Sequence, residues 1–109
     1  MSELLIEKYK GFSECEKRLT ERASEGWVLW GLTYDHMFKD IFLATYKKGD
    51  PERAKFRIHK IVEQKWEKIY ASLNKIQEDG WELVSSSWDV ASAVVKTWQI
   101  LVVACKQKF

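Results

Sequence analysis

Residues that punctuate or cross-link a chain are scarce in this sequence. Its 109 residues include one proline, five glycines and two cysteines, and no apolar run approaches the ~20 residues that a membrane-spanning helix requires. Cys15 and Cys105 match no metal-binding or redox spacing, so we expect buried free thiols; a disulfide would instead indicate an oxidising compartment or a hyperthermophilic source. The first residues lack the basic start and long apolar stretch of a secretory signal. Together these absences predict a cytoplasmic protein that does not bind membranes.

Neither sign of charge is in large excess. The formal net charge is +2 and the isoelectric point is about 8.5, below the range above ~9 that is usual for domains binding nucleic acid non-specifically. Hydrophobic residues make up 46% of the chain and charged residues 31%, a balance typical of a folded protein and not of a disordered one. The length suits one domain with one hydrophobic core.

Groups that could perform catalysis are also few. His36, in an expected turn, and His59, on an expected strand, have no second ligand at a recognised metal-binding spacing. The run Ser85-Ser86-Ser87 lacks the glycines that surround a nucleophilic serine on a sharp turn. We therefore predict no catalytic, cofactor-binding or metal-binding residues, no cofactor, and a protein that is not an enzyme.

What the sequence does contain is an internal repeat. Residues 19–30 and 73–84 match at a constant offset of 54. The matching positions are Leu19 with Leu73, Glu25 with Asp79, Gly26-Trp27 with Gly80-Trp81, and Leu29 with Leu83. In both copies the glycine stands where a helix end needs a residue that tolerates positive φ, and the tryptophan opens a strand. A duplicated unit is the natural interpretation.

The patterns around the two copies predict the same series of elements twice. Amphipathic helices are expected over 13–25, with Ser13 and Glu16 spaced as a capping box, and over 65–79. Strands are expected over 4–10, 27–35, 38–48, 55–62, 81–89 and 96–106. We predict an α+β domain of two βαββ repeats, about 1–48 and about 54–109, joined by a linker at 49–53. The expected arrangement is one antiparallel sheet with both helices on one face, related by a pseudo-two-fold axis.

The second copy carries a recognisable signature. Leu73-Asn74 followed by Gly80-Trp81-Glu82-Leu83-Val84 resembles a family of small uncharacterised bacterial and phage domains, here as a tandem duplication. The resemblance covers about 55–106, and the first copy departs from the signature at Thr20, Val28 and Trp30. It implies a strand, a helix and a two-stranded hairpin, and a phage or mobile-element origin. The family brings no reaction and no functional residues with it.

Aromatic residues are more numerous than one small core easily buries. Strict alternation along the strand after the first helix places Trp30, Leu32 and Tyr34 on one face, and Trp88 takes a similar position in the second copy. An exposed apolar patch of that size usually marks an interface, so a homodimer or a protein partner is the leading prediction. A closed sheet with a second core or a ligand cavity, and a different strand phase, are the alternatives.

A basic row is the second candidate surface. Arg53, Lys55, Arg57 and His59 alternate, so an extended strand presents all four on one face, where they could bind phosphates beside stacking tryptophans. An edge strand protected from aggregation by its charges has the same pattern, and we favour that interpretation because acidic residues flank the row.

The sequence therefore predicts a non-enzymatic binding or interaction module that acts through an aromatic sheet face, most simply as a homodimer. The alternative is a nucleic-acid- or nucleotide-binding protein that uses the basic row with Trp30 or Trp88. A small-molecule pocket between helices and sheet, with or without catalysis, is a third hypothesis.

Overall fold

A computed structural model describes residues 3–35, 37, 40–92 and 95–108. The elements follow the order β1 (Leu4–Lys10), α1 (Phe12–Ser24), β2 (Trp27–Asp35), β3 (Ile41–Lys48), β4 (Ala54–Glu63), α2 (Trp66–Glu78), β5 (Glu82–Ser92) and β6 (Thr97–Lys108). The α+β class and the expected order of elements are confirmed. His36 and the first two residues of the strand expected at 38–48 lie outside the described residues.

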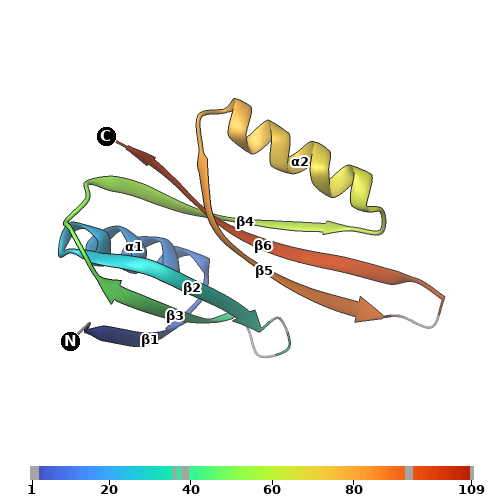
Figure 1. The fold of residues 1–109 in the computed structure, drawn as a ribbon. Coiled ribbons are helices and arrows are strands. Elements are labelled where there is room, and N and C mark those ends of the chain that lie inside the picture. Colours follow the sequence, from blue (N-terminus) through green and yellow to red (C-terminus); the bar gives the residue numbers. More distant parts are fainter. Residues whose placement is uncertain (1–2, 36, 38–39, 93–94, 109) are drawn as a thin grey trace.

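The strands form two sheets, where the sequence predicted one (Figure 1). Sheet 1 has the order β1-β3-β2 and sheet 2 the order β4-β6-β5, and every pairing is antiparallel. Each half of the chain thus builds its own three-stranded sheet, with the third strand of the half in the middle. Alternating apolar residues predict strands but do not say which strands pair, and this is why the prediction of one shared sheet was wrong.

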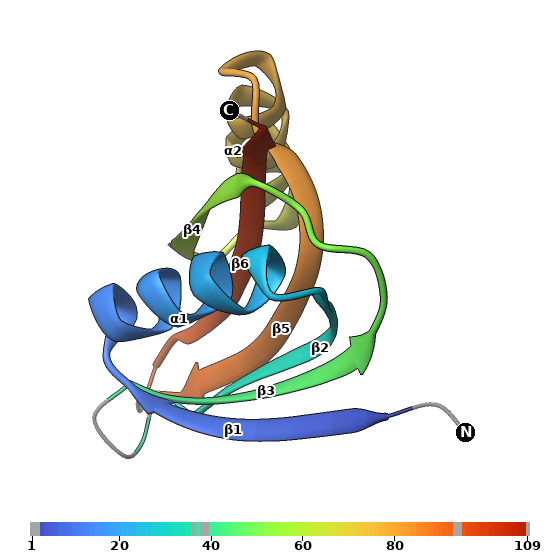
Figure 2. The same cartoon turned by 90° about the vertical axis from the view of Figure 1, so that its left-hand side faces the viewer.

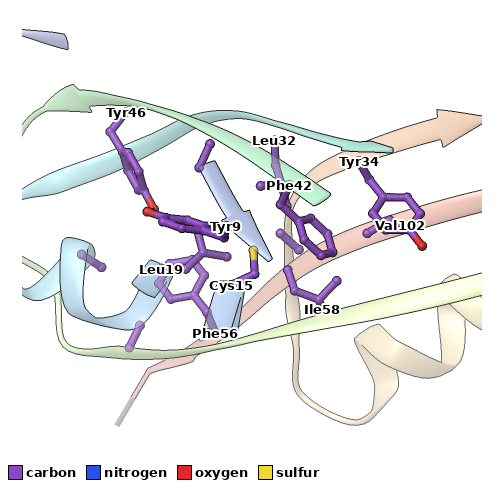
Figure 3. Close-up of a cluster of buried hydrophobic side chains, with 14 of the residues drawn as sticks. Tyr9, Cys15, Leu19, Leu32, Tyr34, Phe42, Tyr46, Phe56, Ile58 and Val102 are labelled. Carbon is purple, nitrogen blue, oxygen red and sulfur yellow. The ribbon is translucent and has the colours of Figure 1, made fainter. Parts of the chain in front are cut away.

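The first helix lies between the two sheets. Sheet 1 and sheet 2 stand at a steep angle to each other with β2 beside β5, and α1 fills the angle (Figure 2). The backbone N–H of Tyr34 in β2 donates to Ser87 Oγ in β5 over 3.3 Å. Side chains from α1 and from both sheets form one buried cluster (Figure 3). Its members include Tyr9, Cys15, Leu19, Leu32, Tyr34, Phe42, Tyr46, Phe56, Ile58 and Val102.

The second helix covers the other face of sheet 2. Ile69 and Ile76 of α2 pack on Leu101, Val103 and Cys105 of β6, whereas the alternate residues of β6 face α1. The two helices therefore lie on opposite faces of sheet 2, which corrects the expectation that both cover one face. Moreover, α1 of the first half meets a sheet face of the second half. A two-fold axis would require like surfaces to meet, and this arrangement brings unlike surfaces together.

The sequence predicted where the two helices end but not how α1 begins. Gly26 and Gly80 have φ of 94° and 90°, and each amide donates to a carbonyl of the last helical turn, so the predicted glycine stops are confirmed. The capping box at the start of α1 was wrong. Gly11 is the N-cap and no described side chain caps the helix there. Glu16 Oε2 instead accepts the backbone N–H of Ile58 in β4 over 2.8 Å.

A β-bulge interrupts each of the strands that follow a helix. The pairing register shifts between Leu29 and Gly31 in β2 and between Leu83 and Ser85 in β5, again 54 residues apart. The extra residue reverses the alternation of side chains beyond it. Leu32 and Tyr34 consequently turn into the core, where they are 3% and 7% exposed. The prediction that they share an exposed face with Trp30 was therefore wrong.

Candidate interaction surface

The outer face of sheet 1 is uncovered and carries several exposed apolar side chains. Its apolar residues are exposed and belong to neither buried cluster. No described helix or strand lies against the side of sheet 1 that is opposite α1 (Figure 2). We call it the open face and define it by six exposed residues: Leu4, Ile6, Lys8, Val28, Trp30 and Leu43. Trp30 is 69% exposed because the bulge at Leu29–Gly31 leaves its side chain outside the core. An uncovered apolar face of this kind usually marks a docking surface.

Trp88 is also exposed, but on a different surface. It pairs with Leu101, which faces α2, so its ring lies on the α2 side of sheet 2. The centroid of the Trp88 ring is 6.4 Å from that of Trp66 at the start of α2. The Nε1–H of Trp88 donates to the side chain of Gln99. Together with two exposed α2 residues these rings make the Trp66–Trp88 surface, defined by Trp66, Tyr70, Asn74 and Trp88. The single aromatic face predicted from Trp30 and Trp88 is thus two separate surfaces.

The basic row lies on a sheet edge, as its alternation indicated. Arg53, Lys55 and Arg57 are exposed, and β4 is an edge strand of sheet 2. The Arg57 guanidinium lies 5.6 Å from the centroid of the Trp81 ring, and the His59 ring meets the same tryptophan edge-on at 6.3 Å. These contacts hold Arg57 and His59 on the protein's own aromatic residue. Contact of the row with nucleic acid stays a prediction.

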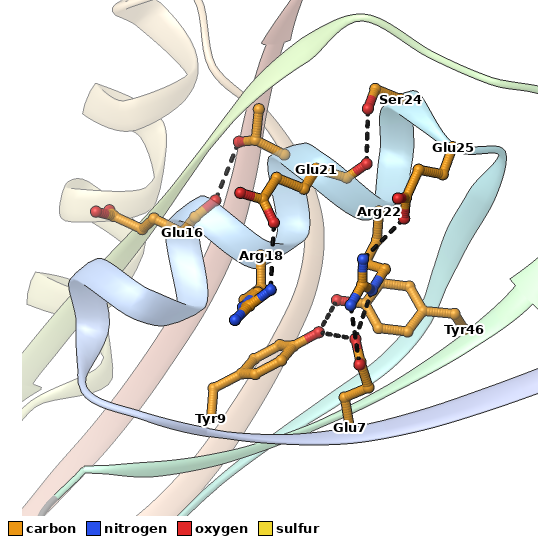
Figure 4. A network of polar contacts seen from close by, with 10 residues as sticks. Glu7, Tyr9, Glu16, Arg18, Glu21, Arg22, Ser24, Glu25 and Tyr46 are labelled. Atoms are coloured by element: carbon orange, nitrogen blue, oxygen red, sulfur yellow. Dashed lines mark hydrogen bonds and ion pairs between the residues drawn. The ribbon is translucent and has the colours of Figure 1, made fainter.

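A charged network fixes β1 to α1 (Figure 4). Arg22 donates from Nε and Nη2 to the two oxygens of Glu7 over 2.6 and 3.0 Å, and the Tyr9 hydroxyl donates to the same carboxylate over 2.7 Å. Because Tyr9 gives its proton to Glu7, its oxygen accepts the proton of Tyr46, 2.7 Å away. The hydrogen bond from Arg22 holds the pKa of Glu7 below its ordinary value. Burial raises the pKa of Tyr46 to about 12 and also raises the pKa of Tyr9, so both hydroxyls stay neutral.

The cysteines lie in two different apolar clusters. In the part of the chain that the structure describes, both are free and buried, Cys15 between the sheets and Cys105 beneath α2. Burial raises the pKa of the Cys15 thiol to about 12 and that of Cys105 to about 11. Both groups are therefore protonated at neutral pH and poor nucleophiles.

The most enclosed of the cavities is small, and the larger ones are grooves open to solvent. The pocket where the sheets meet, between Trp27, Phe56 and Val84, holds about 80 Å³, far below the ~300 Å³ at which ligand sites begin. A larger groove of about 610 Å³ runs along α1 and the edge of β4, but it is open and lined by charged side chains such as Glu16 and Lys55. Among the described residues, no group of three or more His, Cys, Asp or Glu side chains could hold a metal ion.

Sequence reasoning missed several residues of the two surfaces. Trp66 lies in the amphipathic helix expected over 65–79, and that pattern gives no sign that its side chain is 43% exposed. Ile6 lies in the strand expected over 4–10, and β1 alternates between exposed and more buried positions. Alternation of this kind separates the two faces of a strand, but it does not show which face is covered.

A helix with the length and hydropathy of a membrane span is absent from the part of the chain that the structure describes.

Comparison with family models, with curated proteins and with solved structures finds no match to this chain.

Proposed function

We propose that this chain is a non-enzymatic interaction module that associates with a second copy of itself through the open face. The observation that carries the proposal is the exposure of Ile6 and Trp30, 62% and 69%, on a sheet face that no described element covers. Burying such side chains contributes about 25 cal/mol for each Å² removed from water, which favours association.

The second half of the molecule supports this proposal. The pairing registers place Ile6 and Ile58 at equivalent positions of β1 and β4. The residues just before them, Leu5 and Arg57, pair with Tyr46 and Cys105, which are equivalent residues of the central strands β3 and β6. Ile58 is buried against α1, whereas Ile6 is exposed. A face of the same kind is thus covered in one half and open in the other.

We further infer that the two halves arose by duplication of one βαββ unit. The support is the shared order of elements and strands, the positive φ of Gly26 and Gly80, and the two bulges at the same offset of 54. A duplicated unit would carry a face suited to burial in both copies, and in the first copy no described element covers that face.

Light scattering tests the proposal. The parent protein should have the mass of an assembly, with little change as the salt concentration rises, because an apolar contact is not screened by ions. Trp30→Ser should shift the mass to that of the monomer without unfolding the chain. Val95→Ser is the matched control, since Val95 is 88% exposed outside both surfaces and its loss should leave the mass unchanged. A parent that remains monomeric at every concentration would refute the proposed function.

A further inference from the structure

The contact between α1 and sheet 2 is a template for covering a face of this type. In register, Phe56, Ile58 and Lys60 of β4 correspond to Leu4, Ile6 and Lys8 of β1. The first three face α1 or the side chains of sheet 1, whereas their counterparts form part of the open face. Within one chain, the element that covers such a face is the helix of the neighbouring unit.

Equivalent aromatic residues beside the two helices differ in exposure, as expected if the contact of α1 with sheet 2 is the template. Phe12 and Tyr34 lie with ring centroids 5.8 Å apart in the first half, and at an offset of 54 they correspond to Trp66 and Trp88, which lie 6.4 Å apart. Tyr34 is 7% exposed because sheet 2 packs over it, but Trp88 is 58% exposed. The second half therefore presents an aromatic pair whose counterpart is buried by a following sheet.

Two polar contacts across the internal junction also have counterparts on the two surfaces. Lys60 Nζ lies 5.6 Å from the centroid of the Tyr34 ring, and the corresponding pair is Lys8 on the open face with Trp88. The backbone N–H of Phe56 donates to Thr20 Oγ1 over 3.1 Å. The residue at the position of Thr20 in α2 is Asn74, which is exposed and has an acceptor oxygen.

We propose that the Trp66–Trp88 surface of one copy docks on the open face of the next, so that copies join head to tail and repeat the internal packing of α1 on sheet 2. This inference rests on the proposed function and specifies which surface of the second copy is used. The layers then continue as sheet 1, α1, sheet 2, α2 and the sheet 1 of the next copy. Because unlike surfaces meet, two copies form a closed dimer only if the rotation that relates them also brings the second pair of surfaces together. Any other rotation gives a larger ring or a filament.

The docking places the side chain of Lys8 over Trp88 and the hydrophobic side chain of Ile6 against α2. It also brings the amide of Asn74 to the edge of β1, at the backbone N–H of Leu4. Trp88 and Ile6 are therefore the positions at which a cation harms the contact most. A lysine at Trp88 faces Lys8, and a lysine at Ile6 replaces an apolar contact with a charge.

The test uses two full-length variants, Ile6→Lys and Trp88→Lys, singly and mixed, followed by analytical ultracentrifugation. Both substituted side chains are more than half exposed, so the fold should survive, and far-UV and near-UV circular dichroism checks this. Each variant alone should raise the dissociation constant by about tenfold or more, as loss of a central contact does. An equimolar mixture should form a heterodimer, because Ile6→Lys keeps an intact Trp66–Trp88 surface and Trp88→Lys keeps an intact open face.

The outcomes separate this inference from the proposed function. A heterodimer that forms only in the mixture supports head-to-tail docking, and each variant alone at the same total concentration serves as the control for non-specific association. If Trp88→Lys assembles as tightly as the parent while Ile6→Lys does not, the open face pairs with itself or with another surface. The head-to-tail inference is then overturned and the proposed function stands. A monomeric parent overturns both.

Discussion

The two halves of this molecule share a plan but not an environment. Sheet 1 has a helix on one face and nothing described on the other, whereas sheet 2 is covered by α1 on one face and by α2 on the other. The two helices also differ in what they contact. Helix α1 contacts both sheets, and α2 packs on sheet 2. Which apolar side chains are buried therefore depends on which elements lie against each half, and not on the sequence pattern of that half. Substitutions at equivalent positions should reveal this difference.

The largest contrast is expected between Leu19 and Leu73, which occupy equivalent positions in α1 and α2. Leu19 is 1% exposed at the centre of the main cluster, and Leu73 is only half-buried. Leu19→Ala should lower the free energy of unfolding by about 3–5 kcal/mol because it leaves a cavity enclosed on all sides. Leu73→Ala should cost about half as much. Urea denaturation measures both, and equal losses would contradict the idea that α1 is the more enclosed helix.

A smaller contrast concerns acid sensitivity, which the first half should dominate. Glu7→Gln replaces the carboxylate that accepts from Arg22 and Tyr9, and it should cost about 2 kcal/mol near neutral pH. The lowered pKa of Glu7 means that its contribution is present above the ordinary value of 4.5 and is lost as the pH falls through the lowered pKa. The difference in stability between parent and variant should therefore shrink as the pH falls below 4.5.

Denaturation curves of parent and Glu7→Gln at several pH values test this sign. A gap between the two proteins that stays constant from neutral to acidic pH would show that Glu7 acts by packing alone. The position in β4 that corresponds to Glu7 is His59, whose Nε2 is buried without a hydrogen-bond partner among the described residues. The second half has no equivalent carboxylate there.

The smallest contrast is expected between Thr20 and Asn74. Thr20→Val keeps the shape of the side chain but removes the acceptor for the Phe56 N–H, and it should cost about 1 kcal/mol. Asn74→Ala changes an exposed residue and should leave the stability of the monomer within about 0.5 kcal/mol of the parent. Both are measured by thermal unfolding at a concentration where the protein is monomeric. Similar losses in the two variants would mean that Asn74 has a contact within its own chain.

The parts of the fold that depend on local chemistry could be predicted from the sequence. Gly26 and Gly80 end their helices as expected, since a positive φ favours glycine wherever it occurs. The number of sheets could not be predicted, because the pairing of strands depends on contacts between residues far apart in the chain. The capping box failed for a similar reason. Glu16 is needed at the edge of β4, a strand that begins 38 residues later.

The candidate surface was predicted in part. Trp30 and Trp88 are exposed aromatic residues, as the surplus of aromatic side chains indicated. Leu32 and Tyr34 were assigned to the wrong face because one extra residue in β2 reverses the alternation, and a period of two gives no sign of such an insertion. The relation between Trp30 and Trp88 depended on how the sheets stack, which is a property of the whole fold.

The hydrogen bonds that Phe56 and Ile58 donate to α1 have a consequence for behaviour at high concentration. An edge strand with unoccupied N–H groups is a template on which a strand from another molecule can add, and such growth leads to amyloid-like fibrils. Thr20 and Glu16 occupy these donors in β4, so a foreign strand could add there only after α1 had moved away. At this edge, the same helix that fills the core also protects the protein against fibril formation.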